Sequence, residues 1–170
     1  MNPLKALDDM RTIKQLLTDA ERISREMGEE EPAAEHLLLA AMGLPEGSAV
    51  RALGSMGVDA DRIRAALLEE QADALVAVGV PRETADRLAA PEPLGPGGAA
   101  RLYGAAPTAR EAFRIAGDLA RHAKQRFAGA HVVAAVATIE RGTVARALER
   151  LGLDRGQLAD AAARELGSPA

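Results

Sequence analysis

The sequence contains no cysteine and no tryptophan, and its only aromatic side chains come from one tyrosine and two phenylalanines. Without cysteine, the chain has no disulfide, no thiolate metal ligand and no thiol nucleophile, and this composition fits a reducing cytosol. With so few rings, it lacks the platforms on which nucleic-acid bases stack and the aromatic anchors that dominate many protein interfaces. Several common kinds of site are therefore excluded before any motif is considered.

The chain also lacks an excess of positive charge and a long apolar run. Its formal net charge is −4 and its pI is near 5.5, which opposes binding to the nucleic-acid backbone. Residues 1–10 carry Lys5, Asp8 and Asp9 and resemble neither a signal peptide nor a membrane anchor. We expect a soluble, cytoplasmic protein with no nucleic-acid or membrane partner.

Apolar residues recur at steps of three and four throughout the sequence, and no stretch alternates with a period of two. This pattern predicts an all-α fold of about ten helices. Gly28 is expected to end the first helix, and Gly129 to break the chain before a later one. The helices are expected at 4–27, 33–42, 48–56, 60–70, 73–78, 82–89, 107–123, 131–139, 143–151 and from 155 onward.

One stretch of the sequence occurs twice. Residues 35–67 return as residues 130–162 with a shift of 131 − 36 = 95 positions, without a gap. Such self-similarity, which includes turn residues as well as apolar ones, indicates two helical units of one kind. The matching pairs are His36 and His131, Ala40 and Ala135, Gly47 and Gly142, Arg51 and Arg146, Ala52-Leu53 and Ala147-Leu148, Gly57 and Gly152, Asp59 and Asp154, and Ala66 and Ala161.

The repeated turn residues predict how the helices begin and end. Ser48 and Thr143 are expected to be N-caps, because each follows a glycine and carries an oxygen that can accept from free helix amides. Asp59 and Asp154 are expected to cap the next helix in each copy. Their preceding glycines, Gly57 and Gly152, are expected at the left-handed position that ends a helix.

The two copies are separated by a stretch without a counterpart. Residues 91–98 contain three prolines and three glycines and cannot be helical. We therefore predict a first repeat over residues 1–72, an insert and linker over 73–104, and a second repeat over 105–170. Together these would form one compact double-repeat domain.

The repeated motifs resemble a known family. The first copy has Ala-Glu-His-Leu-Leu-Leu at 34–39, Gly-Ser-Ala-Val-Arg-Ala-Leu at 47–53 and Met-Gly-Val-Asp at 56–59. The second has Ala-His-Val-Val at 130–133, Gly-Thr-Val-Ala-Arg-Ala-Leu at 142–148 and Leu-Gly-Leu-Asp at 151–154. These are similar to the Clp N-terminal repeat, or Clp R domain, of Clp-type AAA+ unfoldases.

The resemblance implies two four-helix motifs related by an approximate twofold axis, serving as a docking surface for substrate proteins and adaptors. No Gly is followed by Lys, so a P-loop is absent and the chain resembles a stand-alone docking module. We expect a non-enzymatic protein- or peptide-binding module without cofactor or metal, acting in regulated proteolysis or competing with a full unfoldase. Clp unfoldase or protease components are further candidate partners. The alternatives are a helical regulatory or ligand-sequestering protein, such as a sensor of a cyclic peptide, and an enzyme.

The resemblance also points to Glu35, His36 and His131 as candidate ligand-binding residues. In some relatives the Glu of the Glu-His pair in each repeat receives an arginine-phosphorylated substrate. Here the first copy keeps Glu35, but the second has Ala130, and Met10 lies where a matching threonine is expected. These departures argue against phosphoarginine recognition at the second site and weaken the case for it at the first.

These residues also have structural interpretations. Glu35 fits an acid at a helix N-terminus, where the helix dipole favours negative charge. His36 and His131 begin equivalent helices, so each is expected to make a structural hydrogen bond that fastens its helix to the neighbouring repeat. Arg51 and Arg146 are expected to tie to helix C-terminal carbonyls, with a partner-binding role as the alternative.

Overall fold

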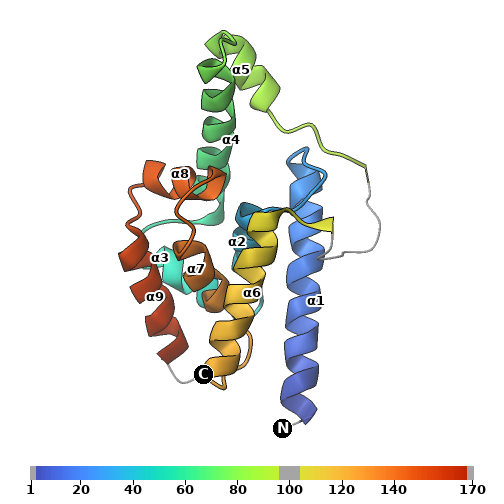
Figure 1. Cartoon of the computed structure of the whole chain (residues 1–170), viewed down its shortest axis with the longest axis vertical. Coiled ribbons are helices and arrows are strands. Elements are labelled where there is room, and N and C mark those ends of the chain that lie inside the picture. The colour runs from blue at the N-terminus through green and yellow to red at the C-terminus, as the bar shows by residue number, and fades with distance from the viewer. Residues whose placement is uncertain (1–2, 96–103, 168–170) are drawn as a thin grey trace.

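A computed structural model describes residues 3–95 and 104–167 of the chain (Figure 1). Within these residues the protein has nine α-helices and no strand, which confirms the predicted all-α fold. In the same residues, no helix has the length and apolar composition needed to cross a bilayer. The helices are α1 (Pro3–Glu26), α2 (Ala34–Met42), α3 (Ser48–Gly54), α4 (Ala60–Ala77), α5 (Arg82–Ala89), α6 (Pro107–His122), α7 (Gly129–Ala137), α8 (Thr143–Arg150) and α9 (Arg155–Gly167).

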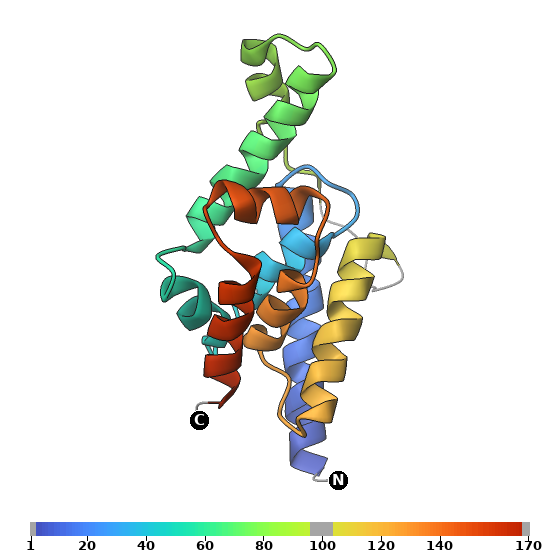
Figure 2. The same ribbon diagram turned by 60° about the vertical axis from the view of Figure 1, so that its left-hand side comes forward.

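The helix contacts have the pattern of a twofold axis. Helix α1 packs on α2 in the first repeat as α6 packs on α7 in the second, and α2 and α7 pack on each other at the centre (Figures 1 and 2). Helix α3 packs on α9, and α4 packs on α8. Because α3 corresponds to α8 and α4 corresponds to α9, these two contacts are equivalent under the twofold axis. Each repeat therefore packs two of its helices on helices of the other repeat.

The central helices form the core because of their sequence. All nine residues of α2 are buried, including the run Leu37, Leu38 and Leu39. A helix that is apolar all round must be enclosed by other elements. In this fold α1, α6 and α7 enclose α2, as the apolar run predicted.

The loop of the first repeat caps the central helix of the second. Ala128, the N-cap of α7, offers no side-chain oxygen, so the free amides at the start of α7 need another partner. The amide of Gly129 donates to Glu46 Oε1 at 2.7 Å, and that of Ala130 donates to Ser48 Oγ at 2.8 Å. The two repeats are therefore joined through a helix terminus.

The structure corrects one of the predicted pairs of helix caps and confirms the other. The N-cap residues of α3 and α8 are Gly47 and Gly142, so Ser48 and Thr143 are not N-caps. The Ser48 hydroxyl is instead used by the other repeat. Asp59 and Asp154 do cap their helices: each Oδ1 accepts a backbone amide at 2.9 Å, from Arg62 and Gln157 respectively. Gly57 and Gly152 have the expected left-handed φ angles of 73° and 71°.

The end of α4 and all of α5 form an arm that stands away from the bundle (Figures 1 and 2). The sequence predicted a separate helix at 73–78, but α4 runs unbroken from Ala60 to Ala77, because no Gly or Pro interrupts it. Helix α5 then folds back on α4. Residues 72–89, which comprise the end of α4 and all of α5 and which we call the arm, have a small core of their own around Ala72, Ala85 and Ala89.

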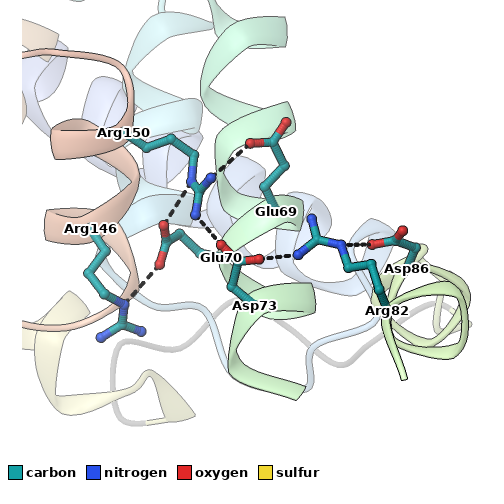
Figure 3. Close-up of polar contacts among 7 residues, drawn as sticks. All are labelled: Glu69, Glu70, Asp73, Arg82, Asp86, Arg146 and Arg150. Atoms are coloured by element: carbon teal, nitrogen blue, oxygen red, sulfur yellow. Dashed lines mark hydrogen bonds and ion pairs between the residues drawn. The ribbon is translucent and has the colours of Figure 1, made fainter. Parts of the chain in front are cut away.

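A network of charged side chains joins the base of the arm to α8 (Figure 3). At its centre, Glu70 is only 8% exposed and accepts from Arg146 at 2.9 Å and from Arg150 at 2.8 Å. Arg150 also pairs with Glu69 and Asp73, and Asp73 pairs with Arg82 on α5. The network thus fixes α4 and the arm to the second repeat.

One ion pair of this network has a twofold counterpart. Arg146 on α8 binds Glu70 on α4 at 2.9 Å, and Arg51 on α3 binds Glu165 on α9 at 2.7 Å. The two arginines are related by the same 95-residue shift as the repeats, and so are the two glutamates. The prediction that the two arginines tie to helix C-terminal carbonyls is therefore wrong, because both bind a carboxylate of the opposite repeat. Arg51 also donates to the loop carbonyl of Glu46 at 3.0 Å.

Replacing Glu70 by glutamine is expected to lower the free energy of unfolding by about 1 to 3 kcal/mol, because a buried acceptor of two charge-assisted hydrogen bonds loses its charge. This loss of unfolding free energy stays below that expected for a fully buried ion pair, because both arginine side chains reach solvent. The matched control is Glu69→Gln, which removes a 55% exposed partner of Arg150 and should change stability by less than about 0.5 kcal/mol. Urea unfolding of both variants measures the difference; equal effects would contradict it.

Candidate docking site

The two equivalent histidines are buried at the starts of the two central helices. His36 Nδ1 accepts from the amide of Ala33 at 2.9 Å, and His131 Nδ1 accepts from the amide of Ala128 at 3.1 Å. Both side chains have no exposed surface. Each histidine therefore satisfies a backbone amide beside its own helix, and the expectation that this bond reaches the neighbouring repeat is wrong.

The second ring nitrogens differ between the repeats. Because Nδ1 accepts, Nε2 carries the proton in each neutral ring. His131 Nε2 lies 3.3 Å from Gln125 Oε1 and donates a hydrogen bond to it. His36 Nε2 has no hydrogen-bond partner among the described residues, and Glu29 Oε1 lies 3.8 Å away. Burial lowers the pKa of His36 to about 4, with a further contribution from Arg64, and burial also lowers the pKa of His131.

Three side chains of the first repeat form a cluster of possible metal donors. Ligand atoms of Glu29, Glu35 and His36 lie within 4.8 Å of one another. In the tautomer that accepts from Ala33, however, His36 Nε2 carries a proton rather than a free lone pair. A metal at Nε2 would need the proton on Nδ1, where it would oppose the amide of Ala33. The donor set therefore fits a metal ion poorly.

Glu35 is the least exposed carboxylate of this cluster, with 7% of its surface exposed. Burial raises the pKa of the Glu35 carboxyl, and the charge of Glu29 acts in the same direction, while its backbone hydrogen bond and Arg146 oppose this. Burial likewise raises the pKa of Glu29, whose carboxylate accepts from Gln71 at 2.8 Å. The cluster combines two desolvated acids with one N–H donor.

The structure separates the residues that the resemblance associated with phosphoarginine. Met10 is 66% exposed on α1, and no described contact connects it with Glu35. The threonine at the start of α2 comes from the second repeat instead: Thr108 Oγ1 accepts from the amide of Ala34 at 3.4 Å. At the second site Ala130 is fully buried. The carboxylate next to the start of α7 is that of Glu46, which is engaged by Gly129.

A cavity of about 930 Å³ lies in the crease between the repeats. It is bounded by α1, by α3 and the loop before it, by the start of α7 and the loop before it, and by the end of α9, so both repeats contribute to it. Of the predicted site residues, only His131 lines it; Glu35 and His36 do not. Its lining is Asp8, Asp9, Thr12, Glu46, Ser48, Arg51, Gln125, Arg126, Phe127, Ala128, His131, Glu165 and Leu166.

A smaller cavity of about 420 Å³ lies within the first repeat. It is bounded by α1, α2, α3 and α4 and has apolar walls formed by Ile23, Leu39 and Val50. Neither cavity is lined by residues 73–95 or 104, the described part of the predicted insert. That part of the insert therefore does not fill the crease.

The fold and the crease define an all-helical double-repeat domain with interlocked halves. Comparison with known proteins gives a family match for part of this domain: the sequence profile of the Clp repeat (R) N-terminal domain matches residues 11–87. These residues, which include the first repeat, therefore match the Clp repeat N-terminal domain, as the motifs around Glu35 and Arg51 predicted. No curated protein sequence matches the chain.

A solved structure with a similar fold is the N-terminal domain of the caseinolytic protease associated chaperone ClpD from Arabidopsis thaliana. The two chains are 18% identical, the match covers 94% of this chain and 92% of that one, and the TM-score is 0.56. At this identity the similarity establishes the fold. It also extends over both repeats, whereas the sequence profile covers the first repeat and the arm.

Proposed function

We propose that the protein is a non-catalytic module that binds substrate proteins, adaptors or peptides in regulated proteolysis, either delivering them or competing with a complete Clp unfoldase. The observation that carries this proposal is the crease of about 930 Å³ on a Clp N-domain fold. Its walls come from both repeats, and concave sites at such interfaces are preferred places for ligands.

The chemistry of the crease suits a polypeptide. Phe127 and Leu166 give it apolar surface, while the ion pairs of Asp8 with Arg126 and of Glu165 with Arg51 place charges of both signs around it. A peptide contacts apolar pockets through its side chains and exchanges hydrogen bonds with such polar groups through its backbone. The cross-repeat capping of α7 keeps the crease walls in fixed positions, which limits the entropy lost on binding.

The test uses a permanently unfolded client, reduced and carboxymethylated lactalbumin, with binding measured by fluorescence anisotropy. Thr12→Trp places an indole in the crease and should weaken binding by about tenfold or more, because the ring occupies space that the client needs. Thr18→Trp is the matched control, since Thr18 is exposed on α1 outside the crease, and should bind like the unmodified protein.

A second readout addresses competition. Excess chain should slow the degradation of the same client by a complete Clp unfoldase and protease, and the Thr12→Trp variant should slow it less. Absence of client binding by the unmodified chain, or equal binding by the two tryptophan variants, would contradict the proposal.

A further inference from the structure

Helix α1 extends beyond the part that the repeat requires. It has 24 residues, whereas its counterpart α6 has 16. When Leu17 is placed on Phe113, α6 lies opposite residues 11–26 of α1. Residues 3–10, which we call the extension, therefore have no helical counterpart among the described residues of the second repeat.

The inner side of the extension is anchored by its acidic residues. Asp9 Oδ1 accepts from the amide of Phe127 at 2.9 Å, and Asp8 pairs with Arg126 at 3.2 Å. Both contacts are to the loop between α6 and α7. The extension is thus held against the second repeat on one side, which leaves its other side facing solvent.

The outer side of α1, along the extension and the turn that follows it, carries two large apolar side chains and two cations. Leu7 is 59% exposed and Met10 is 66% exposed, and Arg11 and Lys14 are exposed beside them. These four residues stand at i, i+3, i+4 and i+7, the spacing of one helix face. We call this set the α1 strip. Arg11 and Lys14 form no ion pair with any side chain that the structure describes.

The charge of the α1 strip is opposite to that of the molecule. The chain carries a net charge of −4, yet the strip has two cations and no acid, because Asp8 and Asp9 are engaged on the inner side. Unpaired cations next to exposed apolar side chains are complementary to a surface that combines carboxylates with apolar residues. Another large exposed side chain, Leu88, lies on the arm and is 64% exposed.

We propose that the α1 strip docks an acidic amphipathic helix of a partner protein, with Leu7 and Met10 covered by its apolar side and Arg11 and Lys14 paired with its carboxylates. This inference rests on the proposed function and names the chemistry of one partner. Two cations and two apolar side chains are too few to hold the protein on an anionic membrane, where each cation adds only about 1 kcal/mol.

The experiment uses a fluorescein-labelled synthetic peptide of about 18 residues with leucines on one helical face and glutamates on the other, a length at which an isolated helix can form. The full chain should bind it, and binding should weaken with added salt. Arg11→Glu combined with Lys14→Glu should weaken binding by about tenfold or more, and so should Leu7→Ala with Met10→Ala.

Matched controls test whether the loss of peptide binding is specific to the α1 strip or follows from changing any exposed cation or leucine. Arg110→Glu reverses an exposed cation on α6, and Leu88→Ala removes an equally exposed leucine on the arm; both should leave peptide affinity unchanged. Circular dichroism confirms that each variant is folded. A peptide with lysine in place of glutamate should not bind.

Several results would overturn the proposal: equal affinity for the glutamate and lysine peptides, unchanged affinity after charge reversal, preferential binding to phosphatidylserine vesicles, or a self-association that the same charge reversal abolishes. The Thr12→Trp variant distinguishes the two proposals, since it should lose the unfolded client but keep the peptide. If the unmodified chain binds the unfolded client but does not bind the glutamate peptide, the α1 strip proposal alone is rejected.

Discussion

Replacing Gly129 by alanine is expected to lower the free energy of unfolding by about 1 to 3 kcal/mol, because the added methyl group has no space. A Cβ at this position would lie 2.9 Å from the carbonyl oxygen of Ala41 and 2.9 Å from the Cβ of Ala49. It would also approach Glu46 Oε1 to 3.0 Å. The variant must therefore push the two repeats apart at the start of α7.

Replacing Gly117 by alanine should change the free energy of unfolding in the opposite direction. Gly117 lies within α6, and a Cβ there would meet nothing within 4 Å. Alanine should then stabilise the protein by up to about 1 kcal/mol through its higher helix propensity. Urea unfolding of both variants checks the pair. A stabilising effect at both positions would show that α2 and α7 are not in close contact at Gly129.

Replacing His36 by glutamine should make the protein less sensitive to acid. Because the folded pKa of His36 is near 4 and that of a free histidine is about 6.5, its neutral form contributes stability above the unfolded pKa that is lost as the pH falls. Between about pH 7.5 and about pH 5 the unmodified protein should lose about 2 kcal/mol more than the variant. Glutamine can still accept the amide of Ala33, so the cap is retained.

The raised pKa values of Glu29 and Glu35 act in the other direction, since their stability contribution is lost as the pH rises, but both proteins retain these residues. The measurement is urea unfolding at the two pH values. His122 is exposed on α6, and His122→Gln serves as the control that should follow the unmodified protein. Parallel losses in the unmodified protein and the His36 variant would contradict the prediction.

The sequence predicted those features that depend on local residue types. The apolar run of α2, the glycines after α3 and α8, and the caps at Asp59 and Asp154 follow from local periodicity and turn chemistry, and all were confirmed. The resemblance to the Clp repeat, based on motifs in both copies, was also confirmed.

The contacts between the repeats could not be predicted in the same way. Spacing shows that Ser48 is equivalent to Thr143, but not that the Ser48 hydroxyl lies beside the amide of Ala130. Gly129 was expected to break the chain, yet it is the first residue of α7 and allows α2 to approach. Likewise, the threonine at the start of α2 comes from the other repeat.

One inter-repeat contact did leave a signal in the sequence. Arg51 and Arg146 are related by the repeat shift, and so are Glu70 and Glu165. Two repeated cations and two repeated acids in a twofold arrangement favour a pair of equivalent ion pairs, which the structure contains at 2.7 Å and 2.9 Å. Glu35, His36 and His131 stay predictions as ligand-binding residues.

The exchange of contacts between α3 and α9 and between α4 and α8 bears on the origin of the chain. A solitary half would leave α2 without α7 and Arg51 without its acid, so it would be stable only by pairing with a second half. A single repeat would therefore need a second copy of itself as a partner, and tandem duplication places both copies in one chain. Once joined, the two halves were free to diverge, and a loss such as that of the acid at Ala130 could affect one side alone.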